Sequence, residues 1–96
     1  MLNVYLVTYD IADEKRLRLV FKTIHGFGEH LQFSVFRCEL SPANLVRLKM
    51  TLAEIIDHRA DQVLIFHLGP LDGFRADQVE SLGQPYVHSD HDAVVV

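Results

Sequence analysis

The 96-residue sequence contains a single cysteine, no tryptophan and no long apolar run. The lone thiol, Cys38, cannot form a disulfide within the chain, and its strand-like surroundings predict a buried, unreactive side chain. The longest apolar stretch is too short to cross a bilayer and no basic segment precedes it, so we expect a cytoplasmic protein with no membrane partner. The sequence also lacks a serine nucleophile elbow, a P-loop, a dinucleotide fingerprint and a Cys-x-x-Cys pair, and with them the usual signals of those enzyme classes.

Positive charge is also scarce. The chain has nine lysines and arginines and 13 acidic residues, which gives a net charge of −4. This balance argues mildly against a nucleic-acid partner, but the charges are unevenly distributed. Residues 1–48 carry six basic and five acidic side chains, whereas residues 49–96 carry three and eight. We therefore expect any surface that binds a polyanion to come from the first half of the chain.

The length and composition predict one small globular domain. Apolar residues make up 49% of the chain and charged residues 23%, with no low-complexity tract, which is typical of a folded chain. A domain of this size buries only a modest core, so association into a dimer would add to its stability.

In the first half of the chain, the apolar pattern predicts a strand, a helix and a second strand region. The run Leu2–Tyr9 is apolar on nearly both faces, as in a central strand. Asp13 is expected to cap a helix over Glu14–His25. Residues 30–40 change the phase of their alternation, which requires a bulge, a kink or a very tight turn near Phe33–Ser34.

The second half predicts one more helix and at least one more strand. Ser41-Pro42 is a strong helix start, Gln62–Leu68 reads as a strand, and residues 74–82 fit either a short strand or a helical turn. The order suits an α+β ferredoxin-like βαββαβ sandwich, an antiparallel sheet with two helices on one face and an extra C-terminal strand. We expect residues 1–82 to form this domain and residues 83–96 to form a linker and a terminal strand that pairs with a partner subunit.

Asp10 ends the first apolar run, at the carboxyl end of the expected strand. A carboxylate there can serve as a hard ligand for Mg²⁺, or it can simply end the strand by bonding to nearby backbone N–H groups. One carboxylate is a weak metal site. Two copies of Asp10 that meet across the two-fold axis of a homodimer would make a better one.

Basic residues line one side of the expected first helix. Lys15, Arg18 and Lys22 fall within about 60° of one another on a helical wheel, with Arg16 to one side. They form either a ridge that contacts phosphates or an ordinary solvated helix face. Leu19 lies on the same polar side without a role in the core, which favours a partner that covers part of this face.

The C-terminal residues combine a polar stretch with an apolar end. His88–Asp92 contains histidines and aspartates, but no element would fix their geometry, so a solvated linker is expected there rather than a metal site. Ala93, Val94, Val95 and Val96 predict a short strand that adds to the sheet edge of another chain, or that pairs within its own subunit.

An ordered set of segments, spread over almost the whole chain, resembles one known family. The segments are Tyr9-Asp10-Ile11 with Asp13, Lys15-Arg16-x-Arg18, Gly28-Glu29, Gln32-Phe33-Ser34-Val35-Phe36, Cys38-Glu39-Leu40, Glu80-Ser81-Leu82-Gly83-x-Pro85-Tyr86 and Ala93-Val94-Val95-Val96. Together they closely resemble the CRISPR-associated protein two family, the small partner of the adaptation integrase. His30 and Phe33 stand where that family often has arginine and tyrosine.

The resemblance implies a ferredoxin-like fold and a tight homodimer in which the two Asp10 side chains face each other and hold magnesium. It implies a dimer that bridges subunits of the integrase, CRISPR-associated protein one, during spacer acquisition, with the C-terminal strand helping to dock the integrase. Metal-dependent endoribonuclease or DNA endonuclease activity has been assigned to members, and here it would be a conditional second activity. Binding to DNA or RNA backbone is expected through five basic side chains: Lys15, Arg16, Arg18, Lys22 and Arg37. A small-ligand regulatory domain of the same fold class is the alternative, although no glycine-rich ligand loop supports it.

Overall fold

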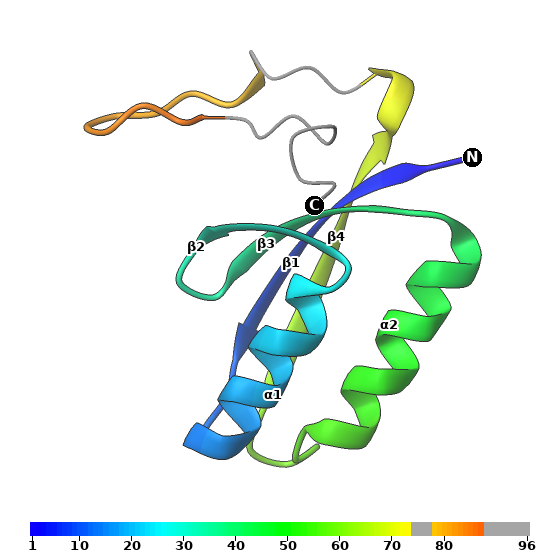
Figure 1. Cartoon of the computed structure of the whole chain (residues 1–96), viewed down its shortest axis with the longest axis vertical. Coiled ribbons are helices and arrows are strands. Elements are labelled where there is room, and N and C mark those ends of the chain that lie inside the picture. Colours follow the sequence, from blue (N-terminus) through cyan, green and yellow to red (C-terminus); the bar gives the residue numbers. More distant parts are fainter. Residues whose placement is uncertain (74–77, 88–96) are drawn as a thin grey trace.

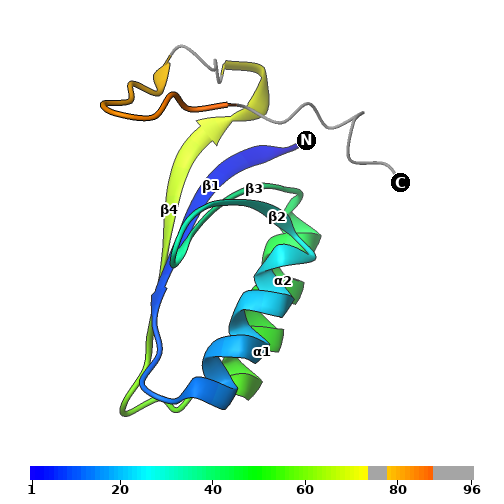
Figure 2. The same cartoon turned by 60° about the vertical axis from the view of Figure 1, so that its left-hand side comes forward.

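A computed structural model describes residues 1–73 and 78–87 of the chain. Its elements are β1 (Asn3–Asp10), α1 (Glu14–His25), β2 (Gly28–Gln32), β3 (Val35–Leu40), α2 (Pro42–Ile55), β4 (Gln62–Pro70) and the short 3₁₀ helix η1 (Leu71–Gly73). The strands form one antiparallel sheet in the order β2-β3-β1-β4. Both helices cover the same face of this sheet (Figures 1 and 2). The predicted ferredoxin-like α+β architecture is confirmed.

Both helices begin at the residues that the sequence indicates. The Asp13 side chain accepts a hydrogen bond from the backbone N–H of Arg16 at 3.0 Å. The Ser41 hydroxyl accepts one from the Asn44 N–H at 3.2 Å, with Pro42 directly after it. Each cap satisfies one of the N–H groups that a helix leaves unpaired at its start.

The change of phase in residues 30–40 is produced by a two-residue turn. Phe33 and Ser34 separate β2 from β3, and Phe33 adopts a positive φ of 21°. The pairing of the two strands also shifts between His30 and Gln32, so an irregularity in β2 accompanies the turn. A tight turn and an irregularity of the β2 pairing are thus both present, and the turn leaves Phe33 95% exposed at the tip of the hairpin.

The core fills the space between the helices and the sheet. It consists of Tyr5, Val7 and Tyr9 from β1, Val20 and Ile24 from α1, Phe36, Cys38 and Leu40 from β3, and Leu48 and Leu52 from α2. Cys38 is fully buried, as predicted, and burial raises the pKa of its thiol to about 12. Gly28 lies so close to β3 that a Cβ there would collide with Cys38 Sγ and the Arg37 carbonyl oxygen.

The described part of the C-terminal segment crosses the sheet face that the helices leave open (Figure 2). Residues 79–82 adopt neither helix nor strand, so neither expected form is seen there. Ala93–Val96 and His88–Asp92 lie outside the described residues, and the division at residue 82 stays a prediction. In the described ranges, no helix is both long and apolar enough to span a membrane.

Candidate functional site

Asp10 is the last residue of β1, and its side chain is exposed. Its strand partner is Gln62, the first residue of β4. Successive side chains of a strand point to opposite faces, and Tyr5, Val7 and Tyr9 point into the core. Asp10 therefore lies on the sheet face that is turned away from the helices.

An apolar row occupies that same face of β4. Leu64, Phe66 and Leu68 are 43%, 46% and 50% exposed, and we call them the outer-face row. Leu64 pairs with Thr8 of β1, which lies two residues before Asp10. Phe66 pairs with Leu6, which lies four residues before Asp10. Exposed apolar side chains that gather on one face mark an interaction surface. A partner docked on this row would also approach Asp10.

Asp61, in the turn before β4, connects three segments of the chain. Its carboxylate accepts hydrogen bonds from the Ala12 N–H at 2.8 Å, the Asp57 N–H at 2.8 Å, Arg16 Nε at 2.7 Å and Arg16 Nη2 at 3.3 Å. The side chain has no exposed surface. The Arg16 guanidinium first, and then the Ala12 N–H, hold the pKa of Asp61 well below its usual range. Sequence analysis missed Asp61, because an aspartate beside a polar turn carries no signal of a partner 45 residues away.

Arg16 is therefore engaged inside the protein. Its guanidinium makes two bonds to Asp61 and lies 3.9 Å from the Asp13 carboxylate. Only 28% of its side chain is exposed. The predicted role of Arg16 as a phosphate contact competes with this internal ion pair.

The remaining basic residues of α1 form the exposed ridge that the sequence predicts. Lys15, Arg18 and Lys22 are all exposed, and we call them the α1 ridge. Val20 and Ile24 face the core, so the α1 ridge lies on the solvent side of the helical layer. The fold thus places the α1 ridge and Asp10 on different sides of the chain, and it does not bring them into one pocket.

A shallow apolar hollow adjoins the α1 ridge. It has a volume of about 330 Å³ and is lined by Tyr9, Leu17, Arg18, Phe21, Phe33 and Ser34. His30 Nε2 lies 2.8 Å from the carbonyl oxygen of Phe33, and the His30 ring packs against Phe21 and Phe36 with centroids 4.9 Å apart. His30 therefore supports the hairpin tip.

Arg37, the fifth predicted phosphate contact, is buried. Its side chain is 4% exposed, with Nη1 2.7 Å from Glu39 Oε2 and 3.9 Å from Glu29 Oε1. It lines a hollow beneath the described C-terminal segment, together with Tyr86. In this position Arg37 balances internal carboxylates, so the phosphate contact expected from the sequence would compete with these ion pairs.

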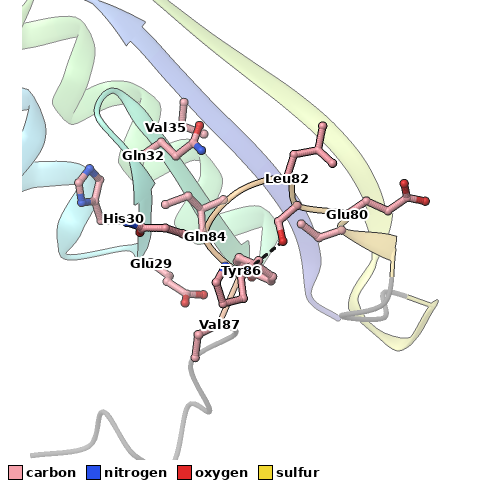
Figure 3. Close-up of a pocket in the computed structure, with 13 residues that line it drawn as sticks. Glu29, His30, Gln32, Val35, Glu80, Leu82, Gln84, Tyr86 and Val87 are labelled. Atoms are coloured by element: carbon pink, nitrogen blue, oxygen red, sulfur yellow. Dashed lines mark hydrogen bonds between the residues drawn. The ribbon is translucent and has the colours of Figure 1, made fainter.

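A larger hollow, of about 540 Å³, separates β2 from the C-terminal segment (Figure 3). Glu29 and Glu80 line it from its two sides, with Tyr86 from the segment that crosses the sheet. The backbone N–H of Tyr86 donates to the Ser81 hydroxyl at 3.2 Å. Two carboxylates at this hollow disfavour a phosphate, so the α1 ridge is the better candidate for nucleic-acid contact.

Magnesium would find one carboxylate at Asp10 in a single chain. The described residues contain no group of three or more His, Cys, Asp or Glu side chains that could hold a metal ion. Mg²⁺ takes oxygen ligands in octahedral geometry and often keeps several waters beside one or two carboxylates. A second copy of Asp10 would bring the set to two carboxylates, so the fit depends on a dimer.

Comparison with known proteins gives a consistent match. A family model described as CRISPR associated protein Cas2 matches residues 3–72. A Geobacter sulfurreducens protein named CRISPR-associated endoribonuclease Cas2 is 40% identical over 96 residues, which is the full length of both chains. A Rhodospirillum rubrum protein named CRISPR-associated endoribonuclease Cas2 1 is 39% identical over 94 residues, covering 98% of this chain and 91% of that protein.

Solved structures agree in fold. The crystal structure of Streptococcus pyogenes Cas2 at pH 6.5 is 39% identical, with a TM-score of 0.72 over 83% of this chain and 99% of that one. A hypothetical protein from Thermus thermophilus is 30% identical, with a TM-score of 0.75 over 91% of this chain and 98% of that one.

Proposed function

The chain belongs to the CRISPR-associated protein Cas2 family, and we propose that it is the homodimeric adaptor that bridges integrase subunits during spacer acquisition. Family membership supports a role in CRISPR adaptation, and the relatives are named endoribonucleases. The observation that carries the adaptor proposal is the outer-face row beside Asp10. This row is an apolar surface on a small domain, and it lies on the same face of the sheet as Asp10.

The outer-face row supports a homodimer. Leu64, Phe66 and Leu68 expose about half of their apolar surface, and their burial would add to a core that is small for an independent domain. In a two-fold dimer the same patch meets itself, so each copy also contributes its Asp10 to the common interface.

Contact with nucleic acid is proposed for the α1 ridge. Lys15, Arg18 and Lys22 are exposed cations on one helix, and none is in an ion pair among those found in the described part of the chain. Exposed cations along one helix face can bind phosphates whatever the base sequence, so we expect binding to depend on salt more than on sequence. A dimer would carry two such ridges, one on the helical layer of each copy.

Magnesium-dependent cleavage is proposed as a second, conditional activity. The two Asp10 carboxylates of a dimer would hold the ion, which when bound would supply Lewis-acid activation of a phosphate or of water. The described residues include no group of three or more His, Cys, Asp or Glu side chains that could hold a metal ion, at Asp10 or elsewhere. The chain alone therefore offers few groups for acid–base catalysis, and the adaptor role does not require them.

The integrase is proposed to dock on the C-terminal residues. Ala93, Val94, Val95 and Val96 would add a strand to the edge of another chain, and the acidic second half of the sequence would keep this region away from DNA. The open edge strands of the sheet are β2 and β4.

A reconstituted spacer-integration assay tests this proposal. The integrase from the same locus is supplied with a duplex prespacer, with or without the parent chain, Asp10→Asn or the control Asp72→Asn, which alters an exposed carboxylate on η1. The adaptor role predicts that integration requires the chain and survives Asp10→Asn. Integration that proceeds equally well without the chain would refute the adaptor role.

A further inference from the structure

The turn before β4 touches the Asp10 region at two consecutive residues. Gln62 pairs with Asp10 through the sheet, and the side chain of Asp61 accepts the N–H of Ala12 at 2.8 Å. Ala12 is only two residues beyond Asp10. The end of β1 and the loop that leaves it are therefore both fixed by one dipeptide.

Asp61 also fixes the far end of that loop. Arg16, in the first turn of α1, makes two bonds to the same carboxylate, and its backbone N–H bonds to the Asp13 cap. Asp57, which follows α2, donates its N–H to Asp61 as well. One carboxylate thus joins the β1–α1 loop, the start of α1 and the end of α2.

A carboxylate suits this position better than other small polar groups. All four contacts are donors, and ionised aspartate offers two oxygens that accept only, whereas asparagine offers one oxygen and two donor hydrogens. The side chain is sequestered from solvent, so it needs the Arg16 charge that faces it. Asp61→Asn would therefore lose at least one bond and leave Arg16 facing an amide.

We propose that Asp61 is a positioning residue that sets the orientation of Asp10, an inference that rests on the metal-binding role proposed for Asp10. Asp61 does not touch the metal, the phosphate or the reacting atoms. It holds Ala12, and through Ala12 the backbone beside Asp10, so that the carboxylate leaves the sheet in one direction. Groups that bond directly to a metal ligand alter metal affinity by about 10–100-fold when they are removed. Asp61 acts through the Ala12 backbone, so we expect the lower end of that range.

Manganese binding and amide exchange together test the inference. Mn²⁺, a paramagnetic stand-in for Mg²⁺, is titrated into the parent chain, Asp61→Asn, Asp10→Asn and the control Glu54→Gln, which removes an exposed carboxylate from α2. Each variant is measured well below its unfolding transition. Asp61→Asn should weaken Mn²⁺ binding about tenfold and speed hydrogen exchange at the Ala12 amide, and Glu54→Gln should change neither.

The outcomes separate this inference from the proposed function. If Asp10→Asn leaves Mn²⁺ binding unchanged, the metal role of Asp10 is wrong and the positioning role falls with it. If Asp10→Asn removes binding but Asp61→Asn keeps the parent affinity, Asp61 serves stability alone and the inference is overturned. Should Asp61→Asn not fold, Arg16→Lys, which keeps the charge but loses the two-pronged contact, must weaken Mn²⁺ binding in the same direction.

Discussion

Arg16 donates from Nε to Oδ2 of Asp61 across 2.7 Å, and this contact ties the start of α1 to the turn that precedes β4. Four basic residues lie along α1, from Lys15 in its first turn to Lys22 in its last, and they divide into two kinds. Arg16 is held inside the protein, whereas Lys15, Arg18 and Lys22 face solvent. The division determines which of them can meet a phosphate.

Arg18 and Arg16 should differ in their effect on nucleic-acid binding. Loss of a phosphate contact flattens the dependence of duplex affinity on salt by about 0.9 in the log–log slope for each contact removed. Arg18→Ala should flatten the slope, and Arg16→Ala should leave it at the parent value. Fluorescence anisotropy with one duplex over a series of salt concentrations measures both, and equal flattening by the two variants would contradict the division.

Asp61 should make the stability of the protein depend on pH in the acid range. Its folded-state pKa is lowered, first by Arg16, so its stabilising effect is complete above the unfolded pKa of about 3.9 and declines as the pH falls below that value. Asp61→Asn should therefore cost stability at pH 7 and cost less at pH 3. Urea unfolding at both pH values measures the difference, and an equal loss at pH 7 and pH 3 would refute the prediction.

Gly28 should be intolerant of even one added carbon. A Cβ there would collide with Cys38 Sγ and with backbone atoms of β3, whereas a Cβ at Gly73 would meet no atom within 4 Å. Gly28→Ala should destabilise the protein by roughly 1–3 kcal/mol, the usual range for an overpacked site. The matched variant Gly73→Ala should stay within about 0.5 kcal/mol of the parent. Thermal unfolding of the two variants decides the matter, and a neutral Gly28→Ala would contradict the close approach of β2 and β3.

Phe66 should control dimer formation. A charge at the centre of the outer-face row would have to be buried without a partner in a face-to-face dimer, so Phe66→Asp should give a monomer. Met50 is 62% exposed on α2, away from that face, and Met50→Asp should leave the dimer intact. Light scattering at micromolar concentration distinguishes the two states. A Phe66→Asp protein that remains dimeric would show that another surface holds the copies together.

Much of the fold follows from local sequence signals. The caps at Asp13 and Ser41 and the apolar spacing of both helices predict their start points, because capping acts over three or four residues. The phase change near Phe33 limited the possible backbone conformations there to three: a bulge, a kink or a very tight turn. Only the backbone showed the two-residue turn, since the choice depends on how β2 and β3 pair.

The site was less accessible to sequence reasoning. Arg37 alternates with the apolar residues of β3 and therefore looks exposed, but the chain crosses that face again near Tyr86 and encloses it. That later segment has no helix or strand periodicity from which its course could be predicted. The role of Asp61 could not be predicted for a related reason, because its partners Arg16 and Ala12 lie 45 and 49 residues away in the sequence.

The adaptor role is tested most directly by the composition of the complex that the chain forms with its integrase on a duplex prespacer. Light scattering combined with chromatography gives the mass of the integrase alone, and of the complex with the 11.0-kDa chain added. The adaptor role predicts a complex with two copies of the chain and integrase subunits bound to both of them. An integrase whose mass does not change when the chain is added, or a complex that holds a single copy, would contradict it.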